Sequence, residues 1–164
     1  MKSSSGPHVS FACICEKVLL EQDGVLSAIR IVDKLNLHQS PREKLDAKTQ
    51  AQAIAGITIL VGLKSGDYKG SGKLSLKAYL PSGQKMSNVK METEIEFKGG
   101  MQGANTIINV GIPFSEEGVY WIDILFEGKV LTRVPLSVSV FPDLSATPEP
   151  PTSKLGRQRS KRKA

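Results

Sequence analysis

Cysteine and histidine are the residue types in this chain best suited to metal binding or nucleophilic chemistry, and they are few. Cys13 and Cys15 stand two residues apart, with His8 shortly before them and His38 farther along. A tetrahedral metal site would need a second Cys or His pair, which the sequence lacks. Two cysteines at i and i+2 are also too close for an ordinary disulfide. We therefore expect both thiols to be structural core residues, and we expect no metal or other cofactor.

Motifs that carry catalysis are also missing. The loop Ser65–Lys73 reads SGDYKGSGK and resembles a phosphate-binding loop, but its glycines have the wrong spacing and Leu74 stands where Ser or Thr is required. No G-x-S-x-G or H-E-x-x-H motif occurs. The prediction is a protein that is not an enzyme. The alternative is an unrecognised hydrolase whose acidic residues are dispersed along the chain.

The basic residues of the chain are concentrated at its C-terminus. Residues 152–164 hold six of the 22 Lys and Arg residues and no acidic residue, so the other 16 balance the 16 acidic residues and the net charge of +6 belongs to this tail. The six are Lys154, Arg157, Arg159, Lys161, Arg162 and Lys163. The positive charge of such a tail could bind the phosphates of nucleic acid. Sequence recognition would be absent, because the tail has no aromatic residue to stack on bases. It could also attach to an anionic membrane surface, or be a solvated terminus without a partner.

Two opposite charges stand in the most apolar part of the chain, Glu117–Val140. This stretch has two runs of β-branched and aromatic residues around a Glu-Gly pair, the pattern of a β-hairpin. A three-residue loop would place Asp123 opposite Arg133, whereas a two-residue loop would put Ile122 beside Arg133. We predict the three-residue register and a structural ion pair between Asp123 and Arg133. Pro135 cannot donate a backbone hydrogen bond, so its strand is a sheet edge at that point or its nitrogen faces away from a partner strand.

Charged residues inside the other strand-like runs are expected to have structural roles. Glu92, Glu94 and Glu96 alternate with apolar residues and therefore predict a solvent-facing row. Arg30 lies within an apolar run. We expect its stem to pack and its guanidinium to reach an aspartate or a loop carbonyl.

Period-two alternation continues through most of the sequence. Strand-like runs cover residues 9–20, 25–37, 54–63, 73–80, 89–97 and 105–114, separated by turn signals. Residues 38–52 favour helix by composition but lack apolar periodicity, and we predict a loop with at most one helical turn. About eight strands without alternating helices predict an all-β fold, an antiparallel β-sandwich that is immunoglobulin-like or C2-like in outline.

The composition divides the chain into three regions. We predict a flexible N-terminus over residues 1–7, a β-sandwich domain over 8–141, and a Pro-rich and then basic disordered tail over 142–164. No window has the roughly 18 apolar residues of a membrane span, and the N-terminus has no apolar signal region. The expected location is the cytoplasm.

Four segments together resemble a known family. They are FACICEKVL at 11–19, DGVLSAIRIVD at 23–33, VGLKSG at 61–66 and IPFSEEGVYWIDILFEGKVLTRVPL at 112–136. They are similar to a bacterial domain-of-unknown-function family of small all-β proteins. The resemblance covers about residues 9–140 and implies a bacterial β-sandwich, but no activity or catalytic residue. The function hypothesis is a non-catalytic module that binds a protein partner through an exposed face or edge strand, with nucleic-acid binding by the tail as the alternative.

Overall fold

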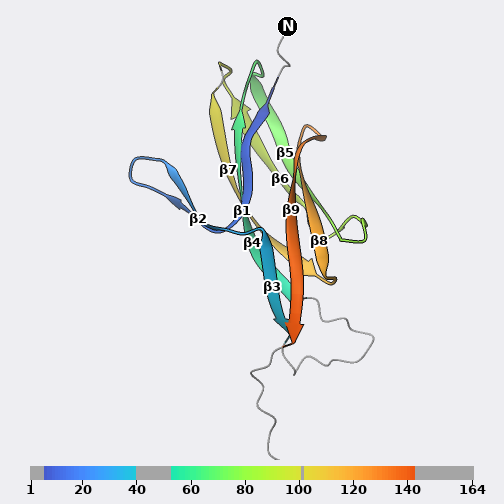
Figure 1. Cartoon of the computed structure of the whole chain (residues 1–164). Helices are drawn as coiled ribbons and strands as arrows, with labels where there is room; N and C mark the ends of the chain where they lie inside the picture. Colours follow the sequence, from blue (N-terminus) through green and yellow to red (C-terminus); the bar gives the residue numbers. More distant parts are fainter. Residues whose placement is uncertain (1–5, 40–52, 101, 143–164) are drawn as a thin grey trace, which may run out of the picture.

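The computed structural model describes residues 6–39, 53–100 and 102–142 and consists of two packed β-sheets (Figure 1). Nine strands occur in these ranges, and no helix does. The strands are β1 (His8–Leu20), β2 (Leu26–Ile31), β3 (Lys34–Gln39), β4 (Ala53–Lys64), β5 (Gly70–Tyr79), β6 (Met91–Phe97), β7 (Gly103–Phe114), β8 (Gly118–Phe126) and β9 (Lys129–Pro142).

The strand order defines the class of fold. One sheet has the order β2-β1-β4-β7 and the other the order β3-β9-β8-β5-β6. All neighbouring strands are antiparallel except β3 and β9, which run parallel. The expected strand over 25–37 divides at residues 32–33, and its halves β2 and β3 belong to different sheets. The predicted β-sandwich is therefore confirmed, with one more strand in the described ranges than the eight expected.

The hydrophobic core lies between the two sheets and follows the period-two alternation. Ile59 and Val61 of β4 face Ile122 and Ile124 of β8, and all four are inaccessible to solvent. Each such side chain contributes about 1.5–3 kcal/mol relative to an exposed one. The core is so closely packed that the size of some residues, and not only their polarity, is constrained. At Gly72 of β5 a Cβ atom would lie 2.1 Å from Cζ of the Phe126 ring, so only glycine fits there.

A tyrosine corner marks the sandwich as immunoglobulin-like. The Tyr120 hydroxyl, near the start of β8, accepts hydrogen bonds from the backbone N–H groups of Ser115 and Glu116 and donates one to the Glu116 carbonyl, at 3.0–3.1 Å. A tyrosine at this corner, hydrogen-bonded to the backbone just upstream, is typical of immunoglobulin-like sandwiches. The strand order agrees, because β1-β4-β7 and β9-β8-β5-β6 occupy the places of strands A-B-E and G-F-C-C′.

The hairpin between β8 and β9 corrects the predicted loop. Phe126 pairs with Lys129, so the turn has two residues, Glu127 and Gly128, both at positive φ as in a type I′ turn. A β-bulge follows, since Ile124 pairs with Thr132 and Leu125 with Val130. The extra residue restores the alternation, and Asp123 still pairs with Arg133. The three-residue loop was wrong, and the bulge, which sequence reasoning did not consider, produces the predicted pairing.

A second bulge places the two cysteines on an unexpected face. The β1–β4 register shifts between Val9 and Phe11, so Val9 packs toward the core while Phe11 and both thiols lie on the outer face of the four-stranded sheet. Cys15 is nevertheless buried and Cys13 half-buried. The expectation that both thiols belong to the main core was therefore wrong. Burial raises the pKa of both thiols.

Two further expectations about single residues have different outcomes. Arg30 does not pack its stem: its side chain is exposed, and its guanidinium lies 3.0 Å from Glu16. Its φ of 52° makes it an irregular position in β2. Pro135 does mark an edge, because β9 pairs with β3 only from Ser137 onward. Residues 40–52 and the basic tail, including its six cations, lie outside the described residues.

Candidate functional site

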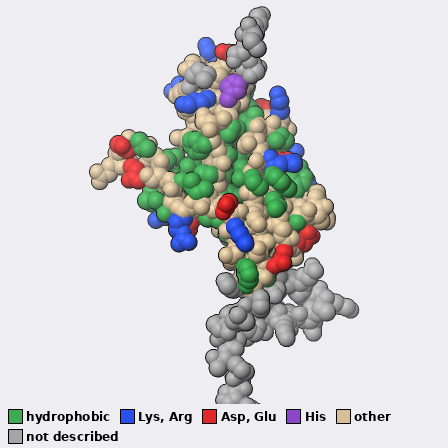
Figure 2. Space-filling view, in the orientation of Figure 1, with side chains coloured by type: hydrophobic (Ala, Val, Ile, Leu, Met, Phe, Trp, Pro, Cys, Tyr) green, Lys and Arg blue, Asp and Glu red, His purple; other side chains and the backbone are tan. Residues whose placement is uncertain are grey.

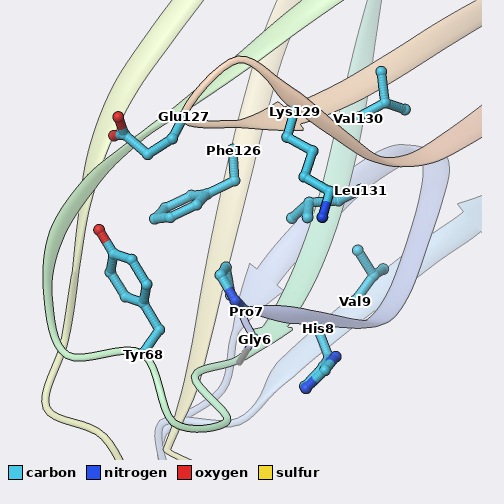
Figure 3. Close-up of a pocket in the computed structure, with 10 residues that line it drawn as sticks. All are labelled: Gly6, Pro7, His8, Val9, Tyr68, Phe126, Glu127, Lys129, Val130 and Leu131. Atoms are coloured by element: carbon cyan, nitrogen blue, oxygen red, sulfur yellow. The ribbon is translucent and has the colours of Figure 1, made fainter. Parts of the chain in front are cut away.

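A cavity of about 740 Å³ lies at one end of the sandwich (Figure 3). Three chain segments form it: the start of β1 with the two residues before it, the β4–β5 loop, and the β8–β9 turn with the start of β9. The lining residues are Gly6, Pro7, His8, Val9, Tyr68, Phe126, Glu127, Lys129, Val130 and Leu131. In immunoglobulin variable domains the B–C and F–G loops, which correspond to the β4–β5 loop and the β8–β9 turn, carry the binding surface.

The floor of the cavity is apolar and built from packed rings. Pro7 is buried, and Figure 3 shows it beside the rings of Phe126 and Tyr68. Phe126 contacts Tyr68 edge to face at 5.1 Å, and both rings contact Phe97 of β6. These aromatic pairs contribute about 0.5–1.5 kcal/mol each beyond the burial of their surface. The cavity therefore offers a preformed apolar seat.

The rim of the cavity carries polar groups from the hairpin tip and from β1. Glu127 stands at φ 48°, and its carboxylate accepts a hydrogen bond from the backbone N–H of Lys73, while its own N–H donates to the Lys73 carbonyl at 2.9 Å. These bonds attach the tip of the hairpin to β5. Lys129 and His8 complete the rim (Figure 3). The mixture suits a ligand that is apolar at its end and polar along its length.

Two incomplete strand edges lie on the side of the sandwich that leads into the cavity. β1 pairs with β2 only from Cys15 onward, and β9 pairs with β3 only from Lys34–Ser137 onward. Within the described ranges, residues 8–13 of β1 and 129–136 of β9 thus have a strand neighbour on one side only. Figure 2 shows hydrophobic side chains gathered on this side of the molecule.

The backbone parity identifies the groups that β9 presents at its open edge. The Ser137 N–H points away from β8, since it donates to the Asp33 carbonyl at 2.9 Å. Backbone groups alternate in direction along a strand, so the N–H and C=O of Arg133 point to the same side. Pro135 shares this parity but has no N–H to offer. On this side of β9, which β1 approaches, the outward backbone groups therefore include the N–H and C=O of Arg133 and the C=O of Pro135.

The ion pair predicted from the sequence lies on the outer face of the sheet beside this edge. Arg133 Nε and Nη2 donate to the Asp123 carboxylate at 2.5 and 3.0 Å, and the Asp123 side chain is 2% exposed while that of Arg133 is 51% exposed. These hydrogen bonds raise the pKa of the Arg133 guanidinium. The guanidinium also lies 5.6 Å from the Tyr79 ring centroid and 5.8 Å from that of Trp121. These contacts hold the guanidinium in place, while the Arg133 side chain as a whole stays half-exposed.

Sequence reasoning identified the ion pair but missed the cavity. Its floor combines Pro7, Tyr68 and Phe126, which are about sixty residues apart in the chain, and no local motif links them. The only sequence signals were that Pro7 and Phe126 lie next to the ends of predicted strands and that Tyr68 lies in a predicted loop. The cysteines and His8 do not come together: no group of three or more potential metal ligands occurs in the described part of the chain. The described residues also contain no helix that could cross a membrane.

The chain is an immunoglobulin-like β-sandwich, and its sequence identifies the family. Residues 10–139 match the model of a family of unknown function, DUF6941, and the chain belongs to that family. The predicted resemblance to an all-β family of unknown function is thereby confirmed. No protein with a curated description matches the sequence.

Several solved structures are similar to parts of this chain. An immunoglobulin-like protein from Pseudomonas aeruginosa is 14% identical with a TM-score of 0.40, and the match covers 84% of this chain and 99% of that one. A β-glucosidase from Listeria innocua is 8% identical with a TM-score of 0.44, covering 83% and 16% of the two chains. The DNA glycosylase AlkC from Pseudomonas fluorescens, solved bound to DNA, is 10% identical with a TM-score of 0.43, covering 84% and 31%. The chain thus spans less than a third of the two enzymes.

Proposed function

We propose that this protein is a non-catalytic interaction module that binds an extended segment of a partner protein. The segment adds a strand to the open edge of β9 and seats an apolar side chain in the cavity at the end of the sandwich. The observation that carries the proposal is that a stretch of β9, residues 129–136, pairs with β8 on one side only and leads into a cavity with an apolar floor. Strand addition of this kind obtains affinity from backbone hydrogen bonds and specificity from side-chain pockets.

The outer face of β9 indicates the chemistry of the partner. The Arg133 side chain stays half-exposed while it binds Asp123, and Lys77 of β5 pairs with Asp123 across the strands. A strand added beside β9 would place alternate side chains next to this group, where an acidic side chain is favoured. We therefore propose an extended partner segment with an apolar residue for the cavity and an acidic residue for Arg133. A reducing, cytoplasmic setting is part of the proposal, in keeping with the two free thiols.

A random-peptide display library, selected on the immobilised full-length protein, tests this function. We expect recovered peptides to be extended, apolar at one end and acidic farther along. Fluorescence anisotropy of a recovered peptide should show at least about tenfold weaker binding to Val130→Glu, because a charge at the cavity rim would be desolvated by the ligand. Arg133→Gln should weaken binding of acidic peptides alone.

Val119→Glu is the matched control. Val119 also lies on the β8–β9 hairpin, and its side chain is 40% exposed compared with 47% for Val130, but it lies away from the cavity lining. This variant should bind the peptide as the original protein does. Recovery of no peptide, or equal binding by Val130→Glu and Val119→Glu, would contradict the proposed site.

A further inference from the structure

The sandwich has four outer edges, and three of them carry features that discourage pairing with another strand. β2 has the exposed Arg30 at an irregular backbone position, β3 begins at Lys34, and β6 presents Glu92, Glu94 and Glu96. Charges and local irregularities of this kind protect the edges of natural β-proteins from unwanted association.

The fourth edge, β7, lacks such protection. Gly103–Phe114 contains no charged residue, and it pairs with β4 at twelve consecutive positions without a register shift. On its other side, β7 has no strand partner in the part of the chain that the structure describes. Pro113, next to the 84–88 loop, limits pairing only at the C-terminal end of β7. A long, regular, uncharged edge is a template for strand addition.

The sequence of β7 is complementary to itself when it is read in opposite directions. An antiparallel pair of β7 strands with its two-fold axis at Ile107 places this residue opposite the partner's Ile107. On the outer face, where Asn105, Ile107 and Asn109 are exposed, Asn105 then lies opposite the partner's Asn109. On the inner face, Thr106 lies opposite the partner's Ile108 and Ala104 opposite the partner's Val110. Amides thus meet amides and isoleucine meets isoleucine, which favours this register.

We propose that β7 is a homodimer interface at which two copies pair antiparallel, joining their four-stranded sheets into one continuous sheet. The contact is the same on both copies, so the dimer is closed and does not extend into a fibre. A single strand pair buries less than about 1,200 Å² in total, which is typical of weak and transient complexes. The interface lies at the opposite edge of its sheet from β2, away from the cavity, so it is independent of the proposed peptide site.

Sedimentation velocity of the full-length protein, from micromolar to millimolar concentration, tests the dimer. We expect a reversible monomer–dimer equilibrium. Ile107→Lys should raise the dissociation constant at least about tenfold, because two like charges would then lie directly opposite each other. The control is Ile29→Lys on β2, since Ile29 is 40% exposed and Ile107 is 42% exposed; this variant should dimerise normally. Circular dichroism should show the same β-sheet content in both variants.

Cysteine substitution tests the register itself. Directly opposite side chains have Cβ atoms about 4.5–5.5 Å apart, so Ile107→Cys should form an intermolecular disulfide under mild oxidation. Asn105→Cys should not, because its opposite residue is the partner's Asn109, but the double variant Asn105→Cys/Asn109→Cys should. A protein that stays monomeric at every concentration, a dimer that persists in Ile107→Lys, or cross-linking by Asn105→Cys alone would overturn the proposal.

Discussion

Removing the hydroxyl of Tyr120 should destabilise the fold through three backbone hydrogen bonds. The Tyr120 ring is completely buried, and its hydroxyl bonds to Ser115 and Glu116 in the β7–β8 connection. Each bond contributes about 0.5–1.5 kcal/mol net, and a backbone group left without a partner costs more when water cannot reach it. Because this connection is partly exposed, we expect Tyr120→Phe to lower the free energy of unfolding by about 2 kcal/mol, toward the low end of the sum.

Equilibrium unfolding in urea measures this change, with the fluorescence of the single tryptophan, Trp121, as the signal. The expected loss corresponds to a fall in Tm of about 6–8 °C, from roughly 3–4 °C per kcal/mol for a domain of this size. Tyr68→Phe is the control, because the Tyr68 hydroxyl makes one exposed hydrogen bond, to the Ser71 carbonyl at 3.0 Å. It should change the stability by less than about 0.5 kcal/mol.

A larger substitution separates the hydroxyl from the ring. Tyr120→Leu also removes the edge-to-face contact with Phe114, whose ring centroid lies 5.0 Å away, and should cost about 3–5 kcal/mol in total. If Tyr120→Phe is as stable as Tyr68→Phe, the hydroxyl does not hold the corner. The assignment of the tyrosine corner as a stabilising element would then be refuted.

Three further predictions concern the core, the thiols and the tail. Gly72→Ala should destabilise by about 1–3 kcal/mol because its Cβ would overlap the Phe126 ring, whereas Gly56→Ala, which faces open space, should be nearly neutral in the same urea titration. Burial raises the pKa of Cys15, so its thiolate fraction at pH 8 is below that of a free cysteine; alkylation followed by mass spectrometry should be slow there and accelerate only at higher pH. If the tail binds polyanions, duplex DNA binding should weaken with salt with a log–log slope down to about −5 and should disappear when residues 152–164 are deleted; equal binding after the deletion would exclude the tail.

Local alternation predicted much of the sandwich because burial in a strand has period two. Ile122 and Ile124 are buried and Trp121 is partly exposed, as their positions in the sequence indicate. The same rule failed at single extra residues. In β1 the bulge near Val9 turned both cysteines to the outer face. The alternation of apolar and polar residues does not predict where a bulge occurs.

The β8–β9 hairpin shows how a correct pairing can come from a wrong premise. Keeping the apolar rows of the two strands on one side of the sheet led to a three-residue loop, because a two-residue loop in a regular hairpin would mix these rows. The chain instead combines the two-residue turn that matches strand twist with a bulge at Leu131. The turn type is set by local backbone geometry, whereas the placing of the apolar rows is set by packing against the other sheet. A bulge satisfies both.

The amino-acid sequence by itself determined that this chain forms a two-layered β-structure with a neutral folded part and a basic tail, since burial alternation and charge are properties of neighbouring residues. Only the tertiary structure decided which strand edges stay open and which distant residues meet. The cavity depends on Pro7, Tyr68 and Phe126 being brought together by the packing of two sheets. The unprotected edge of β7 depends on its place at the end of a sheet. Both follow from strand order, which no local pattern encodes.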